Sequence, residues 1–294
     1  FLKTTVKIIN SIVTDNYMQI FVVSMHDSSI RRQHITDEFG KQGLSWIFFD
    51  ALNHQQGLAK AAQIGVEIRE DLLSGSEIGC FMSHVAIWQQ VVESKTAYAA
   101  VFEDDVYLGG DADKYLNHEQ WLAGIGGLVK LETMLVPCLL AKKVKKIDAN
   151  RQLQRLYSCH WGTAGYIVSY AVAQKLLTYV QRRTALAPID DLMFEYFRKE
   201  TATPIYQMVP AISIQDKVLH EHNQKFDSLV EDERTEKRRN TDNQRRLPEK
   251  TKLGLHQKAA RELKRLQRQC SPDNIKRITA QKLAPRSEET VAFK

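Results

Sequence analysis

The sequence has few cysteines and no long apolar run, and these absences argue against a disulfide-rich protein and a protein that spans a membrane. Its four cysteines (Cys80, Cys138, Cys159 and Cys270) show no paired spacing, which fits thiols that pack as small apolar side chains in a reducing cytosol. No apolar stretch reaches the length of a transmembrane helix. Residues 1–17 lack the continuous apolar core and small-residue cleavage site of a signal peptide, so we expect an extension before a fold that starts at Met18.

Excess positive charge is absent outside the C-terminal region. Residues 231–294 hold 18 Lys and Arg against 10 Asp and Glu, whereas the rest of the chain has a net charge of −2. A body without net positive charge is not expected to bind nucleic acid. In the basic region Leu255, Ala259, Leu263 and Leu266 stand at helical spacing, which predicts either an amphipathic helix on a membrane surface or a helix that packs on its own domain.

Strand and helix patterns alternate along the first hundred residues. Apolar runs and helical periodicities predict a strand at 19–24, a helix at 30–39, a strand at 44–49, a helix at 74–92 and a strand at 98–102. This order favours an α/β fold with a mainly parallel sheet. We expect that domain to occupy residues 18–228, followed by a basic, largely helical tail at 229–294.

The middle of the chain gives weaker patterns. Residues 130–136 are compatible with another strand, and residues 142–146 with a solvated hairpin or loop. Residues 162–169 have the pattern of a strand entered through small residues, and Ser169 is placed to cap a helix that runs to about residue 180.

Three consecutive carboxylates, Glu103, Asp104 and Asp105, end the apolar run at 98–102. Ligands of open α/β sheets collect at this end of the strands, and buried carboxylates need a cation or solvent. On an extended chain Glu103 and Asp105 point to the same side. They are therefore candidate ligands of Mg²⁺ or Mn²⁺ carrying a diphosphate, and the alternative is a solvated acidic loop.

Polar residues near the ends of the first two strands are candidates for binding a nucleotide. Ser24 closes the first strand, and Arg31 follows it, where a guanidinium can bind phosphate or stack on a base. Asp50 and Ala51 end the second strand, where a carboxylate can accept from a base N–H or a ribose hydroxyl. The alternatives are a surface charge for Arg31 and a turn residue for Asp50.

The helix predicted at 74–92 begins with Ser74 and Glu77 at the spacing of a capping box. Glu77, Cys80 and His84 share one helical face. Cys80 and His84 suggest a zinc pair, but no second pair stands at ligand spacing. We instead expect Ser83 and His84 to project polar groups toward a ligand, and Glu77 either to join them or to cap the helix.

Three further segments hold candidate site residues. Gly162 and Thr163 provide backbone N–H groups without bulky side chains, which suits close approach to a sugar or phosphate, or a tight strand entry. Asp190 and Asp191 form a second carboxylate pair that can supply a general base or a helix cap. His220 is a candidate metal ligand, although most such histidines lie on the surface.

Together these segments resemble glycosyltransferase family 25, the bacterial lipooligosaccharide galactosyltransferases, and within it the β-1,4-galactosyltransferases of Gram-negative mucosal bacteria. The resemblance covers about residues 19–215 and extends weakly to the basic tail. The capped helix followed by the acidic strand end is its most specific feature. The matching segments are residues 23–24, 31–32, 48–52, 73–84, 101–106, 131–134, 162–169 and 188–190.

The resemblance implies a GT-A-like nucleotide-sugar-binding fold, a UDP-sugar donor, a bound Mn²⁺ or Mg²⁺, and inversion at the anomeric carbon. The acidic element of the family falls on residues 103–105, where Glu103 is long enough to contact ribose instead of the metal. Asp190 matches the family's carboxylate after Pro-x, so we prefer Asp190 to Asp191 as the base.

The expected reaction is transfer of galactose from UDP-galactose to a lipooligosaccharide acceptor at the cytoplasmic face of the inner membrane of a Gram-negative bacterium, with the basic tail on anionic lipid. Three alternatives stay open. One is a family member that uses UDP-glucose, another is a metal-dependent phosphohydrolase or nucleotidyltransferase, and the third is a non-catalytic protein that binds membranes through its tail.

Overall fold

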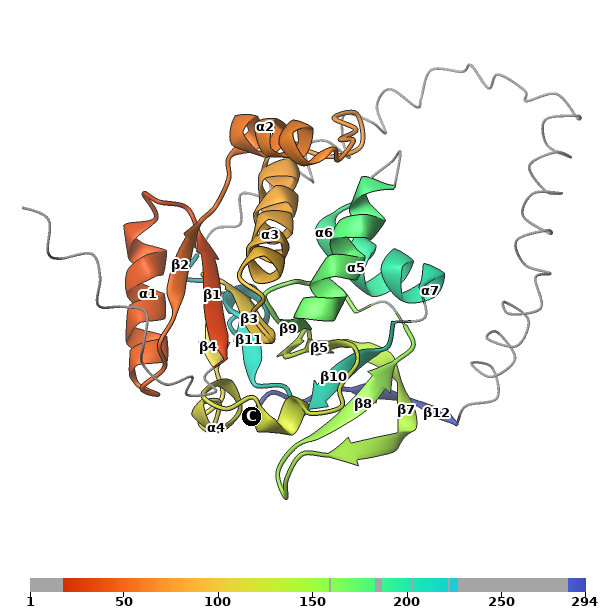
Figure 1. The fold of residues 1–294 in the computed structure, drawn as a ribbon. Coiled ribbons are helices and arrows are strands. Elements are labelled where there is room, and N and C mark those ends of the chain that lie inside the picture. Colours follow the sequence, from red (N-terminus) through yellow and green to blue (C-terminus); the bar gives the residue numbers. More distant parts are fainter. Residues whose placement is uncertain (1–17, 159, 183–186, 202, 222, 227–284) are drawn as a thin grey trace, which may run out of the picture.

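A computed structural model describes residues 18–158, 160–182, 187–201, 203–221, 223–226 and 285–294. These residues form an α/β fold with helices on both faces of a large sheet (Figure 1). The expected extension at 1–17 and the expected amphipathic helix of the tail lie outside the described residues. Within the described part, no helix combines the length and apolarity that a membrane span requires.

The large sheet has mixed pairing. Among the described residues its strands follow the order β12 (Arg286–Thr290), β7 (Pro137–Lys146), β8 (Gln152–Leu156), β10 (Ile205–Val209), β5 (Leu128–Lys130), β9 (Gly165–Ser169), β3 (Tyr98–Glu103), β1 (Gln19–Ser24) and β2 (Ile47–Asp50). β2, β1 and β3 are parallel, as are β10 and β5, whereas the other pairings are antiparallel. The expectation of a mainly parallel sheet is therefore correct at one edge and wrong for the sheet as a whole.

Successive side chains of a strand point to opposite faces, and this alternation divides the core in two. Phe21 and Val101 pack with α2 (His54–Ile64), α3 (Gly75–Glu93) and α5 (Tyr170–Gln181) on one face. Val22 and Phe102 pack with α1 (Ser29–Gly40) and α4 (Asp113–Leu116) on the other. The remaining helical segments are η1 (Gln120–Leu122), α6 (Ile189–Asp191), the π-helical η2 (Leu192–Phe197), α7 (Arg198–Glu200) and α8 (Asp216–Leu219).

A second, small sheet joins β4 (Val106–Leu108), β11 (Ser213–Gln215) and β6 (Glu132–Thr133). β4 follows directly after the acidic residues that end β3, and Gln215 is the register partner of Val106. The small sheet therefore places the end of β11 beside the candidate carboxylates, although the two segments are more than a hundred residues apart in the chain.

The predicted helix starts are confirmed. Ser74 Oγ accepts from the Glu77 N–H at 3.2 Å, and Glu77 Oε2 accepts from the Ser74 N–H at 2.8 Å, which completes a capping box at the start of α3. Ser169 caps α5 by accepting from the Val172 N–H at 3.3 Å. Both caps are local interactions, so the sequence alone is enough to locate them.

Two segments differ from the expectation. The strand expected at 130–136 is split between β5 and β6, which belong to different sheets. Residues 286–290, expected in a largely helical tail, form β12 and pair with β7. In both cases pairing with a distant strand outweighs the local pattern. Residues 142–146, expected as a hairpin or loop, are the exposed end of β7 and form an antiparallel hairpin with the following strand β8.

Candidate active site

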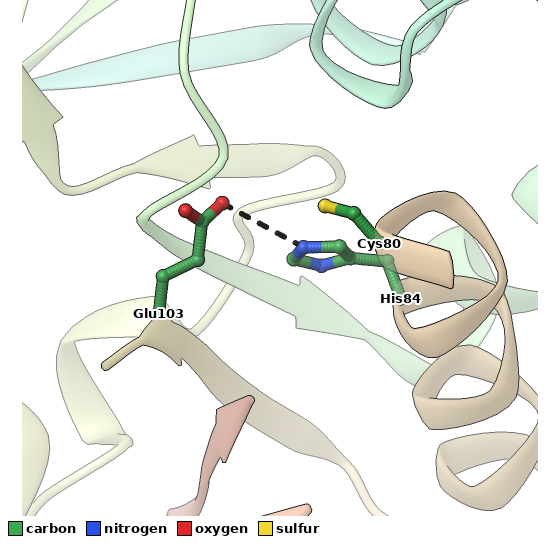
Figure 2. Close-up of side chains that lie close together, drawn as sticks. All are labelled: Cys80, His84 and Glu103. Carbon is green, nitrogen blue, oxygen red and sulfur yellow. Dashed lines mark ion pairs between the residues drawn. The ribbon is translucent and has the colours of Figure 1, made fainter. Parts of the chain in front are cut away.

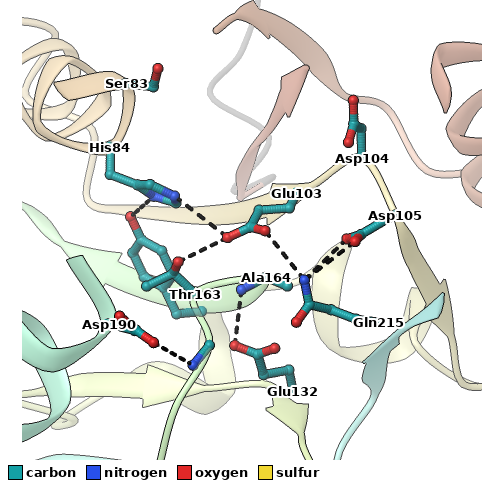
Figure 3. A network of polar contacts seen from close by, with 12 residues as sticks. Ser83, His84, Glu103, Asp104, Asp105, Glu132, Thr163, Ala164, Asp190 and Gln215 are labelled. Carbon is teal, nitrogen blue, oxygen red and sulfur yellow. Dashed lines mark hydrogen bonds and ion pairs between the residues drawn. The ribbon is translucent and has the colours of Figure 1, made fainter. Parts of the chain in front are cut away.

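The first and last carboxylates of the acidic cluster lie in one polar network at the end of β3 (Figure 3), and the middle one, Asp104, has separate partners. Ser24 Oγ donates to Asp104 at 2.7 Å, and Arg31 Nη1 donates to its other oxygen at 2.6 Å. Asp104 is buried, with 7% of its surface exposed. The structure therefore brings Ser24 and Arg31 to the cluster, where they neutralise Asp104 and tie the end of β3 to β1 and α1. Their binding of a nucleotide stays a prediction.

Glu103 receives donors from several distant segments. Thr163 Oγ1 donates to its Oε1 at 2.8 Å and Gln215 Nε2 donates to its Oε2 at 3.3 Å, while His84 Nε2 lies 3.8 Å from Oε1. Burial alone would raise the pKa of Glu103, but the contacts with His84 and Thr163 outweigh it and lower that pKa. Glu103 is consequently an ionised and oriented carboxylate.

Asp105 faces Glu103 across the amide of Gln215. Gln215 Nε2 lies 3.3 and 3.4 Å from the two Asp105 oxygens. Burial, and then the charge of Glu103, raises the pKa of Asp105 to about 7. Arg31 Nη1 lies 4.0 Å from Asp105 Oδ2, and its charge lowers this pKa, but burial and the charge of Glu103 outweigh it. The Glu103–Asp105 pair is therefore short of positive charge.

Glu103 and Asp105 fit a divalent cation, because hard cations prefer carboxylate oxygens. Gln215 turns its amide nitrogen toward both carboxylates, while its buried Oε1 has no hydrogen-bond partner. The assignment of His220 to the metal stays a prediction, and the structure shows a different partner for its ring. His220 instead binds Asp216 at 2.8 Å, since the two residues stand one helical turn apart in α8.

A second group of possible ligand atoms lies on the other side of Glu103. Cys80 and His84 of α3 approach Glu103 so that one ligand atom of each residue lies within 4.8 Å of the others (Figure 2). The sequence indicates this pair as a weak zinc candidate, and the structure adds a third residue to it.

A buried ion pair, Lys130–Glu132, supports the loop that carries Gly162 and Thr163. Lys130 Nζ donates to Glu132 at 2.8 Å and to the carbonyl oxygens of Trp161 and Gly162 at 2.9 and 2.5 Å. Glu132 also accepts from the Ala164 N–H at 2.9 Å. Both side chains are fully buried, so this pair fixes the backbone of the loop rather than binding a ligand.

Gly162→Ala is expected to destabilise the protein and to reduce any activity of the site. Gly162 has φ +90°, and an added Cβ would lie 2.8 Å from both oxygens of Glu132. An L-residue is strained at this φ whatever space it has. Thermal unfolding measures the loss, and Gly110→Ala is the control because an added Cβ there meets nothing within 4 Å. Equal melting temperatures for the two variants would contradict the expectation.

Asp190 joins the same network through this loop. The Gly162 N–H donates to its Oδ2 at 3.4 Å, and the Asp191 N–H donates to its Oδ1 at 3.0 Å. Asp190 is 9% exposed, whereas Asp191 is less buried. The structure therefore brings Asp190, rather than Asp191, into contact with the loop beside Glu103 (Figure 3).

Two candidates on α3 have structural roles. Glu77 completes the capping box, which is the alternative that the sequence left open. Ser83 is wrong as a residue that faces the ligand, because its hydroxyl donates to the Gly79 carbonyl at 2.7 Å and accepts from the Leu52 N–H at 2.8 Å. A serine in a helix commonly bonds the carbonyl one turn back, and here it also ties α3 to the chain after β2.

Asp50 and Ala51 stand where the sequence places them, at the end of β2. Asp50 is exposed and accepts from Arg32 and His26, and the hydrogen bond from Arg32 is the main cause of its lowered pKa. The Ala51 N–H donates to the Ser24 carbonyl at 2.9 Å, which continues the pairing of β2 with β1. Both residues border the site without joining its buried network.

Sequence reasoning missed four residues of the site. Lys130 and Glu132 interrupt an apolar segment with charges two residues apart, a pattern that indicates a buried pair once the strand is known. Tyr166 and Gln215 give no such signal, because each reaches the network from a strand whose neighbours only the tertiary structure shows.

The sequence was compared with known proteins. A model of glycosyltransferase family 25, described as an LPS biosynthesis protein, matches residues 18–193. Lacto-N-neotetraose biosynthesis glycosyltransferase LgtE of Neisseria meningitidis serogroup B is 35% identical over 238 residues, which cover 75% of this chain and 84% of that protein. The chain belongs to glycosyltransferase family 25.

Other relatives of this family 25 chain are similar over comparable lengths. Lipooligosaccharide biosynthesis protein lic2B of Haemophilus influenzae is 32% identical over 222 residues, covering 73% of this chain and 82% of the relative. The crystal structure of a glycosyltransferase involved in the glycosylation of the major capsid of PBCV-1 aligns with 76% of this chain and with 98% of that protein, at 8% sequence identity. Its TM-score of 0.38 is too low to support an argument.

The family match contains most of the polar network of this glycosyltransferase. Residues 103–105, the 161–164 loop and Asp190 lie inside the matched region, whereas Gln215 and β12 lie beyond it. The candidate site is thus assembled from the matched region and completed by a strand that follows it.

Proposed function

We propose that this family 25 glycosyltransferase moves galactose from UDP-galactose to a saccharide of lipooligosaccharide, with inversion and with a β-1,4 linkage favoured. The observation that carries the proposal is the carboxylate pair Glu103 and Asp105, which shares Gln215. Asp190 contacts Gly162 of the loop whose next residue, Thr163, holds Glu103. The names of the similar lipooligosaccharide proteins support the acceptor class. The alternative within the family is that UDP-glucose is the sugar donor.

Glu103 and Asp105 would hold Mn²⁺ or Mg²⁺. The ion supplies positive charge for the diphosphate of the UDP leaving group. Thr163 orients Glu103 through its hydroxyl, and Arg31 keeps Asp104 neutralised next to this pair. Asp190 removes the proton from the acceptor hydroxyl as that oxygen attacks the anomeric carbon opposite UDP, which is how a single displacement inverts the configuration.

A UDP-release assay tests this function. The protein is incubated with UDP-galactose or UDP-glucose, with a lactosyl or N-acetylglucosaminyl acceptor, and with Mn²⁺ or EDTA. We expect acceptor-dependent release of UDP from UDP-galactose in Mn²⁺ and none in EDTA. Release of inorganic phosphate without acceptor would favour a phosphohydrolase. Faster turnover of UDP-glucose than of UDP-galactose would identify UDP-glucose as the donor.

The basic tail extends the proposal to the inner surface of an anionic membrane, where a lipid-linked acceptor lies. Each Lys or Arg near such a surface contributes about 1 kcal/mol of attraction. We expect that replacing Lys258, Arg261, Lys264 and Arg265 by Gln weakens salt-sensitive binding to phosphatidylglycerol vesicles and leaves transfer to a short soluble acceptor unchanged. Vesicle co-sedimentation measures the binding.

The control for the tail variant changes the same number of positive charges at the exposed end of β7. Vesicle binding lost equally in both variants would indicate a dependence on net charge and would contradict a specific role of the tail. The control residues are Lys142, Lys143, Lys145 and Lys146.

A further inference from the structure

We propose that Trp88, Tyr166 and His84 form a buried positioning chain that directs the Nε2–H of His84 at Glu103. The chain fixes one tautomer of His84, and through it the orientation of the Glu103 carboxylate. The tautomer follows from the hydrogen bonds alone. Its effect on the donor site rests on the proposed function.

This positioning chain of three side chains extends from the core of the protein to the end of β3. Trp88 and His84 are one helical turn apart on α3, so their side chains share the face that packs on the sheet. Tyr166 lies in β9 opposite Val101 of β3. Its hydroxyl oxygen is 2.9 Å from Trp88 Nε1 and 2.9 Å from His84 Nδ1. All three side chains are fully buried.

Counting donors and acceptors decides where the proton of His84 lies. The indole N–H of Trp88 can only donate, so the Tyr166 oxygen accepts from it. Burial, the largest influence, raises the pKa of Tyr166 far above its usual value, so the hydroxyl keeps its hydrogen. The acceptor in contact with that hydrogen is His84 Nδ1. A neutral imidazole that accepts at Nδ1 carries its hydrogen at Nε2.

The Nε2–H of His84 then points at Glu103. Nε2 is 3.8 Å from Glu103 Oε1 and is buried without a hydrogen-bond partner of its own. At this distance the N–H attracts the carboxylate electrostatically rather than through a formed hydrogen bond. Thr163 holds the same oxygen at 2.8 Å, and Gln215 holds the other at 3.3 Å. Glu103 is thus oriented on both oxygens, and His84 acts as a positioning residue behind it.

The same count argues against a metal ion bound by Cys80, His84 and Glu103 (Figure 2). A metal at Nε2 needs the lone pair there and moves the hydrogen to Nδ1. Tyr166 would then face two N–H donors, and its own buried O–H would have no acceptor. A buried donor left unsatisfied destabilises the folded state, so the surrounding core favours the tautomer that does not bind metal.

Tyr166→Phe tests the chain because it removes a single hydroxyl from a ring that stays the same size. In protein labelled with ¹⁵N-histidine, the wild-type His84 ring is expected to show the Nε2–H tautomer, assigned with His84→Gln. Tyr166→Phe is expected to give a mixture of tautomers. Tyr115→Phe is the matched control, since its buried hydroxyl donates to Asp148 on the other face of the sheet.

Two further readouts separate positioning from packing and from zinc binding. Loss of a residue that orients a metal ligand typically weakens metal affinity about tenfold or more, so Tyr166→Phe is expected to raise the Mn²⁺ concentration needed for UDP binding by about that factor. Tyr115→Phe should not. The Nδ1–H tautomer in wild-type protein, or purified protein with one zinc that both Cys80→Ser and His84→Gln remove, would overturn the proposal.

The outcomes also distinguish this inference from the proposed function. If the wild-type protein shows the Nε2–H tautomer but binds no UDP in Mn²⁺, the positioning chain is supported and the proposed donor site is wrong. If UDP binds in Mn²⁺ and Tyr166→Phe changes neither the tautomer nor the Mn²⁺ requirement, the donor site stands and the chain is wrong.

Discussion

Asp105→Asn is expected to abolish sugar transfer and to make UDP binding independent of Mn²⁺. The substitution removes one of the two carboxylates that would carry the ion, where the charge of the ion dominates the local field. The Asn side chain keeps an oxygen that can accept from Gln215, so the hydrogen bond at 3.3 Å can persist. Calorimetric titration with UDP, in Mn²⁺ and in EDTA, measures the effect.

The same variant should unfold at a higher temperature than the wild type when both are in EDTA. Burial and the charge of Glu103 raise the pKa of Asp105 to about 7, which means that the ionised form is disfavoured in the folded protein. A neutral Asn removes this penalty above neutral pH. Asp37→Asn, on the exposed face of α1, is the control for loss of a charge. Mn²⁺-dependent UDP affinity that survives in Asp105→Asn would exclude Asp105 from the metal site.

Asp190→Asn is expected to lower kcat by a factor of about 10² or more, as the loss of a general base does. UDP affinity should change little, because Asp190 accepts from the Gly162 and Asp191 backbones, whereas Glu103 and Asp105 would carry the ion that binds the diphosphate. An Asn can still accept from both N–H groups, so the fold of the loop should be preserved. Steady-state kinetics with a soluble acceptor measure kcat, and titration measures UDP affinity.

Asp191→Asn is the matched control, since it changes the neighbouring carboxylate of the same short helix. If Asp191→Asn slows turnover and Asp190→Asn does not, the assignment of the base is reversed. If both variants keep wild-type turnover, neither residue is the base. A parallel loss of UDP affinity in Asp190→Asn would assign Asp190 to the donor site.

The sequence predicts those features that neighbouring residues determine. The capping box at Ser74 and Glu77 is an interaction across three positions, and it fixes the start of α3. The apolar run that ends at Glu103 places the carboxylates at a strand end, because a buried strand cannot continue through three charges. The family resemblance, which rests on the same segments, is confirmed by the match at residues 18–193.

Contacts between distant segments could not be predicted in this way. The pairing of β12 with β7, and the approach of Gln215 to Asp105, join residues more than a hundred positions apart. Ser83 illustrates the same limit, since its polarity suggested a ligand while its partners are backbone groups of α3 and of the chain after β2. His220 was predicted as a metal ligand from its residue type, whereas in the structure its imidazole ring is hydrogen-bonded to Asp216, one helical turn away.

The return of the chain to the sheet as β12 changes how the basic region should be studied. β12 pairs with β7 over five positions, from Arg286 opposite Ala141 to Thr290 opposite Pro137. Cutting the chain before residue 286 would leave the backbone groups of β7 unpaired along an open edge, which promotes aggregation. The region between residues 226 and 285 is therefore tethered at both ends. A variant that lacks the basic region should therefore keep residues 285–294 joined to the domain, so that the β7 edge stays paired.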